Sequence, residues 1–209
     1  MSATWYPVRV DVDVQNGFCD PAGGLHVPAA EEIVPAVARL NADAMARGIP
    51  LIGSVDSHDF SSPEFEQNGG PWPTHCVKGT WDWLKPARTL PARFRIVGRD
   101  PADALAAFED GRAALYFEKD AYSLFDNVNV PPVLARLEAL AASRRARLRF
   151  DVYGVATDFC VKAAIEGLLG RGYAVRLLAD AARAVDPSRD WAGVLREAGT
   201  EIASAADVG

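Results

Sequence analysis

Short β-rich runs alternate with longer segments of helical periodicity along almost the whole chain, and this alternation limits the fold more than any other feature. It is typical of parallel strands joined by crossover helices. We therefore expect an α/β fold, a three-layer α/β/α sandwich around a mostly parallel sheet of about six strands. The runs that read as strands cover residues 7–14, 50–56, 94–97, 113–118, 147–156 and 173–178, with a final one near 200–203.

The helical segments carry recognisable boundaries. One begins near Ala29 and repeats apolar residues until Gly48 stops it. Asp186 and Pro187 have the character of an N-cap and a first helical position, and predict the start of the last helix. The other expected helices cover residues 101–109, the region around 134–141, and the stretch from 158 to the glycine pair at 170 and 172.

The length of 209 residues fits one domain, which we expect to span residues 1–209. Within it, residues 57–93 are rich in Pro, Gly and Trp and show little periodicity. Loops of this length are uncommon in compact domains unless they carry function. We expect this loop to hold a metal and part of a substrate site.

Composition excludes several classes of partner. The net charge of −6 comes with no basic patch, so nucleic acid is not an expected partner. No stretch approaches roughly 20 apolar residues and the N-terminus lacks a signal-like run, so we expect no membrane association and a cytoplasmic location. The three cysteines are too sparse for a disulfide framework, and reduced thiols are expected.

Chemically active side chains follow four of the predicted strands. Asp13 closes the first strand, Asp56 and His58 follow the second, Lys119 follows the strand at 113–118, and Cys160 lies just past the strand at 147–156. Ligands of open α/β sheets bind beyond the carboxyl ends of the strands. We therefore expect these residues to share one edge of the sheet.

Cys160 is the candidate nucleophile. It falls in the first turn of a predicted helix, where unpaired N–H groups and the helix dipole favour a thiolate. A small buried apolar residue is the simpler interpretation, since free cysteine is among the most buried residue types. Asp13 could collect the thiol proton if Lys119 balances its charge.

The loop offers ligands for a metal ion. Asp56 and His58 are separated by one residue, so in an extended chain they point the same way. Glu64, Glu66 and His75 add carboxylates and an imidazole, and such a mixed set suits zinc, iron or manganese. Alternatively, the two histidines are only hydrogen-bonded loop residues.

Several aromatic residues lie near these positions in the sequence and could form a flat slot for a ring. An ordinary core role is the alternative, and for Trp81 and Trp83 it is the one we favour. The aromatic candidates are Phe18, Trp72, Trp81, Trp83 and Tyr122.

Four blocks in this order resemble the nicotinamidase (pyrazinamidase) branch of the isochorismatase-like cysteine hydrolases. They are DVQNGFCDPAGGL from Asp13, the SVDSH…PEF…GGPWPTHCVKGT loop, EKDAYSLF, and GVATDFCVKAAIEGLL around Cys160. Together they span nearly the whole chain. Two departures bear on substrate preference: Gly17 stands where relatives usually carry Asp, and the EKDAYSLF block is short.

The resemblance assigns roles to individual residues. It implies a catalytic triad of Asp13, Lys119 and Cys160, and an oxyanion hole formed by the backbone N–H groups of Ala156 and Cys160, with a cis peptide between Val155 and Ala156. The implied metal ligands are Asp56, His58, Glu64 and His75, where Glu64 replaces a common His and Glu66 is the competing carboxylate. The implied ring-lining residues are Phe18, Trp72 and Tyr122.

The resemblance also implies an activity, namely hydrolysis of nicotinamide to nicotinate and ammonia through a thioester on Cys160. It further implies one divalent ion per chain, with zinc preferred over iron or manganese, and this ion binds the pyridine nitrogen. It also implies pyrazinamide-like amides as related substrates, a place in pyridine nucleotide salvage, and a homo-oligomer. Three alternatives stay open. These are a hydrolase of another small amide or carbamoyl compound, a non-catalytic binding protein, and metal-dependent hydrolysis in which Cys160 is structural.

Overall fold

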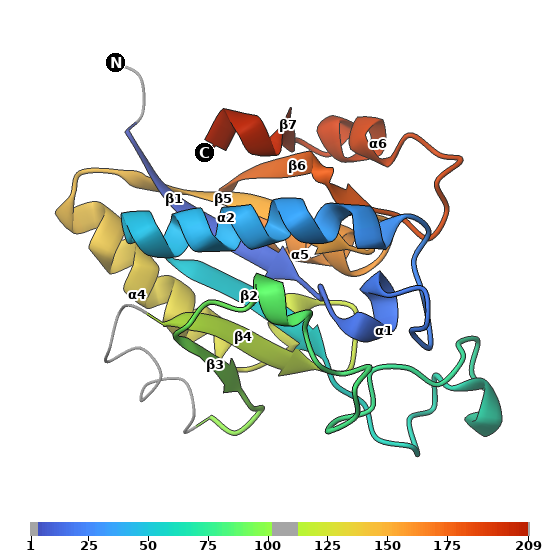
Figure 1. The fold of residues 1–209 in the computed structure, drawn as a ribbon. Helices are drawn as coiled ribbons and strands as arrows, with labels where there is room; N and C mark the ends of the chain where they lie inside the picture. The colour runs from blue at the N-terminus through green and yellow to red at the C-terminus, as the bar shows by residue number, and fades with distance from the viewer. Residues whose placement is uncertain (1–3, 102–112, 209) are drawn as a thin grey trace.

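The computed structural model describes residues 4–101 and 113–208, and these residues build one seven-stranded sheet with helices on both faces (Figure 1). The strand order is β3-β4-β2-β1-β5-β6-β7, and every neighbouring pair is parallel. The predicted α/β class is confirmed, with the short β7 extending the sheet beyond the expected six or so strands. The strands are β1 (Trp5–Val12), β2 (Leu51–Asp56), β3 (Phe94–Val97), β4 (Ala114–Lys119), β5 (Arg147–Val155), β6 (Ala174–Arg183) and β7 (Glu201–Ala203).

The helices form the two outer layers. α2 covers one face of the sheet, while α4 and α5 cover the other (Figure 1). None of the helices within 4–101 and 113–208 is long and apolar enough to cross a membrane. The helices are α1 (Asn16–Cys19), α2 (Val34–Arg47), α4 (Val130–Ser143), α5 (Cys160–Leu169) and α6 (Trp191–Glu197).

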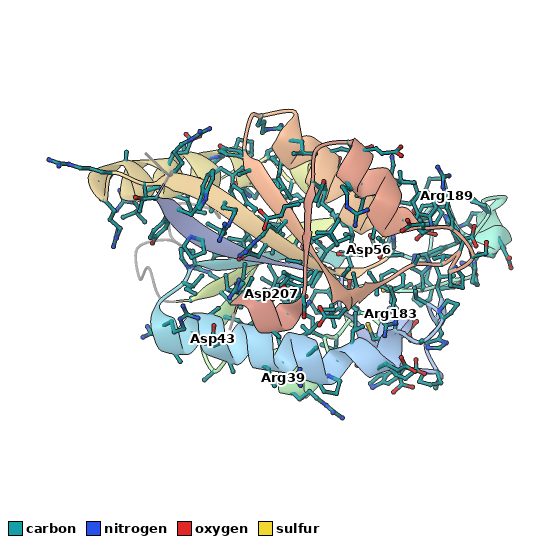
Figure 2. All side chains as sticks on the ribbon, turned by 90° about the horizontal axis from the view of Figure 1, so that it is seen from above. Arg39, Asp43, Asp56, Arg183, Arg189 and Asp207 are labelled. Atoms are coloured by element: carbon teal, nitrogen blue, oxygen red, sulfur yellow. The ribbon has the colours of Figure 1, made fainter. Side chains whose placement is uncertain are left out.

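Both faces of the central strands are buried, because side chains alternate between the two helical layers. On β1, Val8, Val10 and Val12 join the apolar core beneath α4 and α5. The intervening Asp11 is also fully buried, and it accepts a hydrogen bond from Asn41 of α2. In the view from above, Asp56 lies inside the molecule near the sheet, whereas charged residues such as Arg39 on α2 point outward (Figure 2).

The last helix begins later than predicted. The N-cap is Asp190, whose side chain accepts a hydrogen bond from the N–H of Gly193, rather than Asp186. Asp186 is committed elsewhere: its side chain accepts from the N–H of Ser188 in a local turn, and its own N–H donates to Asp158. Tertiary contact thus overrides a favourable local signal.

Two other predictions concern helix boundaries, and only the second of them falls on described residues. The helix expected over residues 101–109 lies almost wholly in 102–112, outside the described residues. At the end of α5, Gly170 keeps a right-handed helical conformation and Gly172 adopts the left-handed one, with φ of 80°. The expected left-handed glycine is therefore the second of the pair.

Candidate active site

The predicted strand-end residues meet at the carboxyl edge of the sheet. Asp13 directly follows β1, Asp56 and Lys119 are the last residues of β2 and β4, and Cys160 is the first residue of α5, which follows β5. These four strands are adjacent in the order β4-β2-β1-β5. The parallel topology therefore brings together side chains that are far apart in the sequence.

Lys119 is the centre of the cluster. Its Nζ lies 2.8 Å from Oδ2 of Asp13, 2.9 Å from Oδ1 of Asp56 and 3.5 Å from Sγ of Cys160. Burial alone would lower the pKa of Lys119, but the carboxylates of Asp13 and Asp56 outweigh it and raise the pKa well above its usual value. The lysine is therefore held as a buried cation.

The thiol of Cys160 is neutral in this arrangement. Burial raises its pKa well above the usual value; the charge of Lys119 acts to lower it, and the carboxylates of Asp13 and Asp56 raise it further. The thiolate expected from the helix N-terminus is thus not favoured here, because desolvation and two carboxylates prevail over the helix dipole and Lys119. The proton has to be removed during a reaction.

The backbone around these groups is unusual at two points. Asp13 has a φ of 47°, a left-handed conformation that costs a non-glycine residue about 1–3 kcal/mol and clusters at functional sites. The peptide between Val155 and Ala156 is cis, as the family resemblance implies. Ala156 and Cys160 both line the pocket beside this cluster.

A second cluster adjoins the first, and Asp56 belongs to both. Nε2 of His58 lies 2.8 Å from Oδ2 of Asp56 and 3.2 Å from Oε1 of Glu64. Nε2 of His75 lies 3.4 Å from the same Asp56 oxygen and 3.2 Å from the same Glu64 oxygen. All four ligand atoms lie within 4.8 Å of one another, whereas Glu66 is exposed.

These four atoms fit a divalent metal ion. In a tetrahedral site with bonds of about 2.1 Å, ligand atoms are about 3.4 Å apart, close to the separations found here. The Nδ1 atoms of both rings have partners, the carbonyl of Pro73 for His75 and the hydroxyl of Ser62 for His58, which leaves Nε2 directed at the cluster. Without an ion, burial acts to lower the pKa of His75, but hydrogen bonds to Asp56 and Glu64 raise it to about 9.

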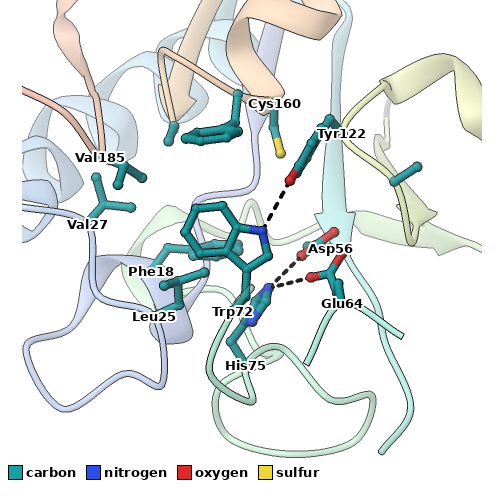
Figure 3. Close-up of a pocket in the computed structure, with 13 residues that line it drawn as sticks. Phe18, Leu25, Val27, Asp56, Glu64, Trp72, His75, Tyr122, Cys160 and Val185 are labelled. Atoms are coloured by element: carbon teal, nitrogen blue, oxygen red, sulfur yellow. Dashed lines mark hydrogen bonds and ion pairs between the residues drawn. The ribbon is translucent and has the colours of Figure 1, made fainter. Parts of the chain in front are cut away.

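We call the four candidate ligands Asp56, His58, Glu64 and His75 the metal cluster. A pocket connects the thiol of Cys160 to this cluster (Figure 3). Phe18, Trp72 and Tyr122 all line it, and the indole N–H of Trp72 donates to the Tyr122 hydroxyl at 3.1 Å. Phe159 completes the aromatic wall: its ring centroid lies 5.3 Å from that of Trp72 and 5.4 Å from that of Tyr122. The aromatic rings therefore form one wall of the pocket, with the Phe159 ring at 86° to that of Trp72 and at 54° to that of Tyr122.

Five pocket residues were not anticipated from the sequence. Phe159 was detectable, since it directly precedes Cys160. The other four are aliphatic and come from three separate segments, so their place depends on how those segments pack. They are Leu25, Val27 and Val185, which we call the aliphatic wall, and Ala121.

The core role favoured for Trp81 is wrong, because its side chain is 49% exposed. Trp83 is half-buried, and its indole N–H donates to the hydroxyl of Ser57 at 3.0 Å. Neither residue lines the pocket. Both residues contact the segment after β1 through their backbone. The carbonyl of Trp81 accepts a hydrogen bond from the side chain of Asn16, and the carbonyl of Trp83 accepts one from the side chain of Gln15.

Comparison with known proteins gives consistent matches. The model of the isochorismatase domain matches residues 9–207. A nicotinamidase/pyrazinamidase from Mycobacterium tuberculosis is 31% identical over 201 residues, which cover 91% of this chain and 95% of that protein. An N-carbamoylsarcosine amidase from Arthrobacter is 26% identical over 170 residues, covering 80% of this chain and 55% of that protein. Among solved structures, the pyrazinamidase of Pyrococcus horikoshii in complex with zinc has a TM-score of 0.74 and 25% identity, with 95% of this chain and 99% of that chain covered.

Proposed function

Because this chain belongs to the isochorismatase domain family, we propose that it is an amidohydrolase that converts nicotinamide to nicotinate and ammonia. One observation carries the proposal. The thiol of Cys160 lines a pocket with an aromatic wall and contacts Lys119, which is paired with Asp13; the same pocket is lined by Asp56, Glu64 and His75 of the candidate metal site. An aromatic ring with a carboxamide is a substrate that uses all of these features.

The reaction begins with proton transfer. Asp13 takes the proton of Cys160 as the sulfur attacks the carboxamide carbon, and Lys119 balances the negative charge between them. Asp13 then gives the proton to the departing nitrogen, the C–N bond breaks, and ammonia leaves a thioester on Cys160. A water molecule transfers a proton to Asp13 as it attacks the thioester. Asp13 passes that proton to the leaving sulfur as the C–S bond breaks, which restores the thiol, and the acid released loses its remaining proton to solvent as nicotinate.

The tetrahedral intermediate requires hydrogen-bond donors for its oxyanion. Cys160 is the first residue of α5, so its N–H has no acceptor within that helix. Ala156 lines the same pocket at the end of β5. These two backbone N–H groups would hold the oxyanion, a contact whose loss typically costs about 3–4 kcal/mol in acyl transfer.

The metal cluster has a supporting role. Asp56, His58, Glu64 and His75 would hold a zinc, iron or manganese ion, which supplies a Lewis-acid site for a lone pair of the substrate. The chain's own residues would complete the orientation of the ring, since Phe18, Trp72 and the aliphatic wall all line the pocket.

The charge of the pocket favours a neutral amide over the second candidate, a carbamoyl compound. None of the lining residues in the described part of the chain is Lys or Arg, and most are apolar. N-carbamoylsarcosine retains the carboxylate of its amino acid, and that charge would be desolvated in a mostly apolar pocket with no Lys or Arg among its described lining residues. Nicotinamide carries no net charge.

We predict that the purified, zinc-loaded protein releases ammonia from nicotinamide, with a kcat/KM about 10²-fold or more above that for N-carbamoylsarcosine. Ammonia release at matched substrate concentrations measures both. A preference for the carbamoyl compound would make it the substrate class instead. Turnover of neither compound by folded, metal-loaded protein would refute the proposed activity.

The choice of Glu64 over Glu66 can be tested through metal binding. Glu64→Gln is expected to weaken zinc binding by about 10- to 100-fold, because an amide oxygen is a poorer ligand than a carboxylate. Glu66→Gln serves as the control, since the Glu66 side chain is exposed and its backbone N–H bond to Trp72 is retained. Chelator competition gives both affinities, and equal losses would contradict the assignment.

A further inference from the structure

The pairing of strands β1 and β2 ends at the site. Their pairing ends at Val12 and Ser54, with one more bond from the N–H of Asp13 to the carbonyl of Ser54. The left-handed conformation of Asp13 then turns the chain away from the sheet. β2 continues to Asp56, whose other side faces β4, where Asp56 is in register with Lys119. β1 therefore no longer runs beside Asp56.

The side chain of Gln15 fills the place beside Asp56 that β1 leaves. Its Oε1 accepts from the N–H of Asp56 at 2.7 Å, and its Nε2 donates to the carbonyl of Asp56 at 2.9 Å. A primary amide offers the same donor and acceptor as a peptide group, so it extends the ladder between β1 and β2 by one pair. Nε2 donates a second bond, to the carbonyl of Trp83 at 2.8 Å, and the whole residue is buried.

Asp56 is the residue for which this support matters most. Its Oδ1 accepts from Lys119 and its Oδ2 faces His58 and His75. A small rotation of the Asp56 backbone would therefore displace both the partner of the lysine and a ligand of the metal cluster at once. The backbone carbonyl of Gln15 accepts hydrogen bonds from the N–H groups of Phe18 and Cys19, so the same residue also fixes the turn that carries Phe18.

We propose that Gln15 is a positioning residue that sets the orientation of Asp56 and thereby aligns the metal cluster with Lys119 and Cys160. The proposal rests on the metal role proposed above. It differs from a general structural role because it ties one side chain to one backbone unit, and it predicts a local effect on Asp56 that is separable from any loss of stability.

The test compares two substitutions with a matched control. Gln15→Met keeps the length of the side chain and removes the amide, whereas Gln15→Asn keeps the amide and shortens its reach by one methylene. Asn41→Leu is the control, because Asn41 is also a buried amide with several hydrogen bonds, made to Asp11, Tyr153 and the carbonyl of Thr89 rather than to Asp56. Zinc affinity is measured by chelator competition, and exchange of the Asp56 amide proton by NMR.

Both Gln15 variants are expected to bind zinc about 10- to 100-fold more weakly than the wild type, and to exchange the Asp56 amide at least about tenfold faster. Asn41→Leu should change neither, although it lowers the melting temperature. Wild-type zinc affinity and Asp56 protection in a folded Gln15 variant would overturn the proposal. If Gln15→Met does not fold, Gln15→Asn decides by the same readouts. If the wild type binds no zinc, the metal role fails, and amide exchange alone decides the role of Gln15.

Discussion

Replacing Cys160 with alanine is expected to lower kcat for nicotinamide by about 10⁴-fold or more, with zinc affinity unchanged. In the proposed mechanism the sulfur forms the thioester. No other group in the described part of the pocket wall is a thiol or hydroxyl nucleophile except the phenol of Tyr122, which accepts a hydrogen bond from Trp72. Ammonia release gives the rate. Mass spectrometry of quenched wild-type reactions should detect one acyl group per chain, and none in Cys160→Ala.

The matched control is Cys19→Ala. Cys19 is also buried, and burial raises the pKa of its thiol to about 12, yet it does not line the pocket. This variant should keep wild-type kcat and lose only stability, by the amount expected for a small core cavity. Full turnover by Cys160→Ala would instead support metal-dependent hydrolysis with a structural cysteine. Binding of nicotinamide without turnover by the wild type would support a binding protein.

The residues at the strand ends could be predicted because two simple regularities coincide there. Alternation of strand and helix implies a parallel sheet, and a parallel sheet gathers the residues that follow its strands at one edge. Asp13, Asp56, Lys119 and Cys160 are polar or reactive residues at such positions. The candidate metal ligands in the loop were identifiable by residue type and, for Glu64, by resemblance to a family.

Other features depend on contacts that a sequence pattern does not specify. Val185 reaches the pocket because Asp158 accepts hydrogen bonds from the N–H groups of Val185 and Asp186, a contact across 27 residues. Gln15 has no local signal of its role, since its partners lie 41 and 68 positions away. The protonation of Cys160 likewise follows from desolvation and nearby carboxylates, and not from its place at a helix start.

The two clusters are coupled through Lys119 and Asp56. A single buried ammonium faces the carboxylates of Asp13 and Asp56, and one of them also belongs to the metal cluster. A metal ion bound at the cluster would be coordinated by the carboxylate of Asp56 and offset its negative charge. Asp13 would then be the principal partner of Lys119. In the proposed mechanism, the proton chemistry therefore depends on Asp13, the carboxylate that does not belong to the metal cluster.

Asp13→Asn is expected to lower kcat by about 10²- to 10⁴-fold, the range typical for loss of a general acid–base group. An asparagine of the same shape cannot take the thiol proton or return it to ammonia. The same variant should react faster with iodoacetamide at Cys160. The Asp13 carboxylate acts to raise the pKa of the thiol, so its removal lowers that pKa and increases the thiolate fraction at a fixed pH between 7 and 8.

The distinguishing result is a fall in the hydrolysis rate together with a rise in the alkylation rate of Asp13→Asn. Asp11→Asn is the matched control: Asp11 lies on β1 two residues before Asp13, is fully buried, and pairs with Lys85 at 3.0 Å as Asp13 pairs with Lys119 at 2.8 Å. It should reduce stability and leave hydrolysis and alkylation near their wild-type rates. If Asp13 only held the structure together, its substitution would lower the hydrolysis rate without accelerating alkylation, because a disordered site loses the lysine that stabilises the thiolate. Hydrolysis that falls while alkylation rises requires a thiolate that is present but lacks its proton donor.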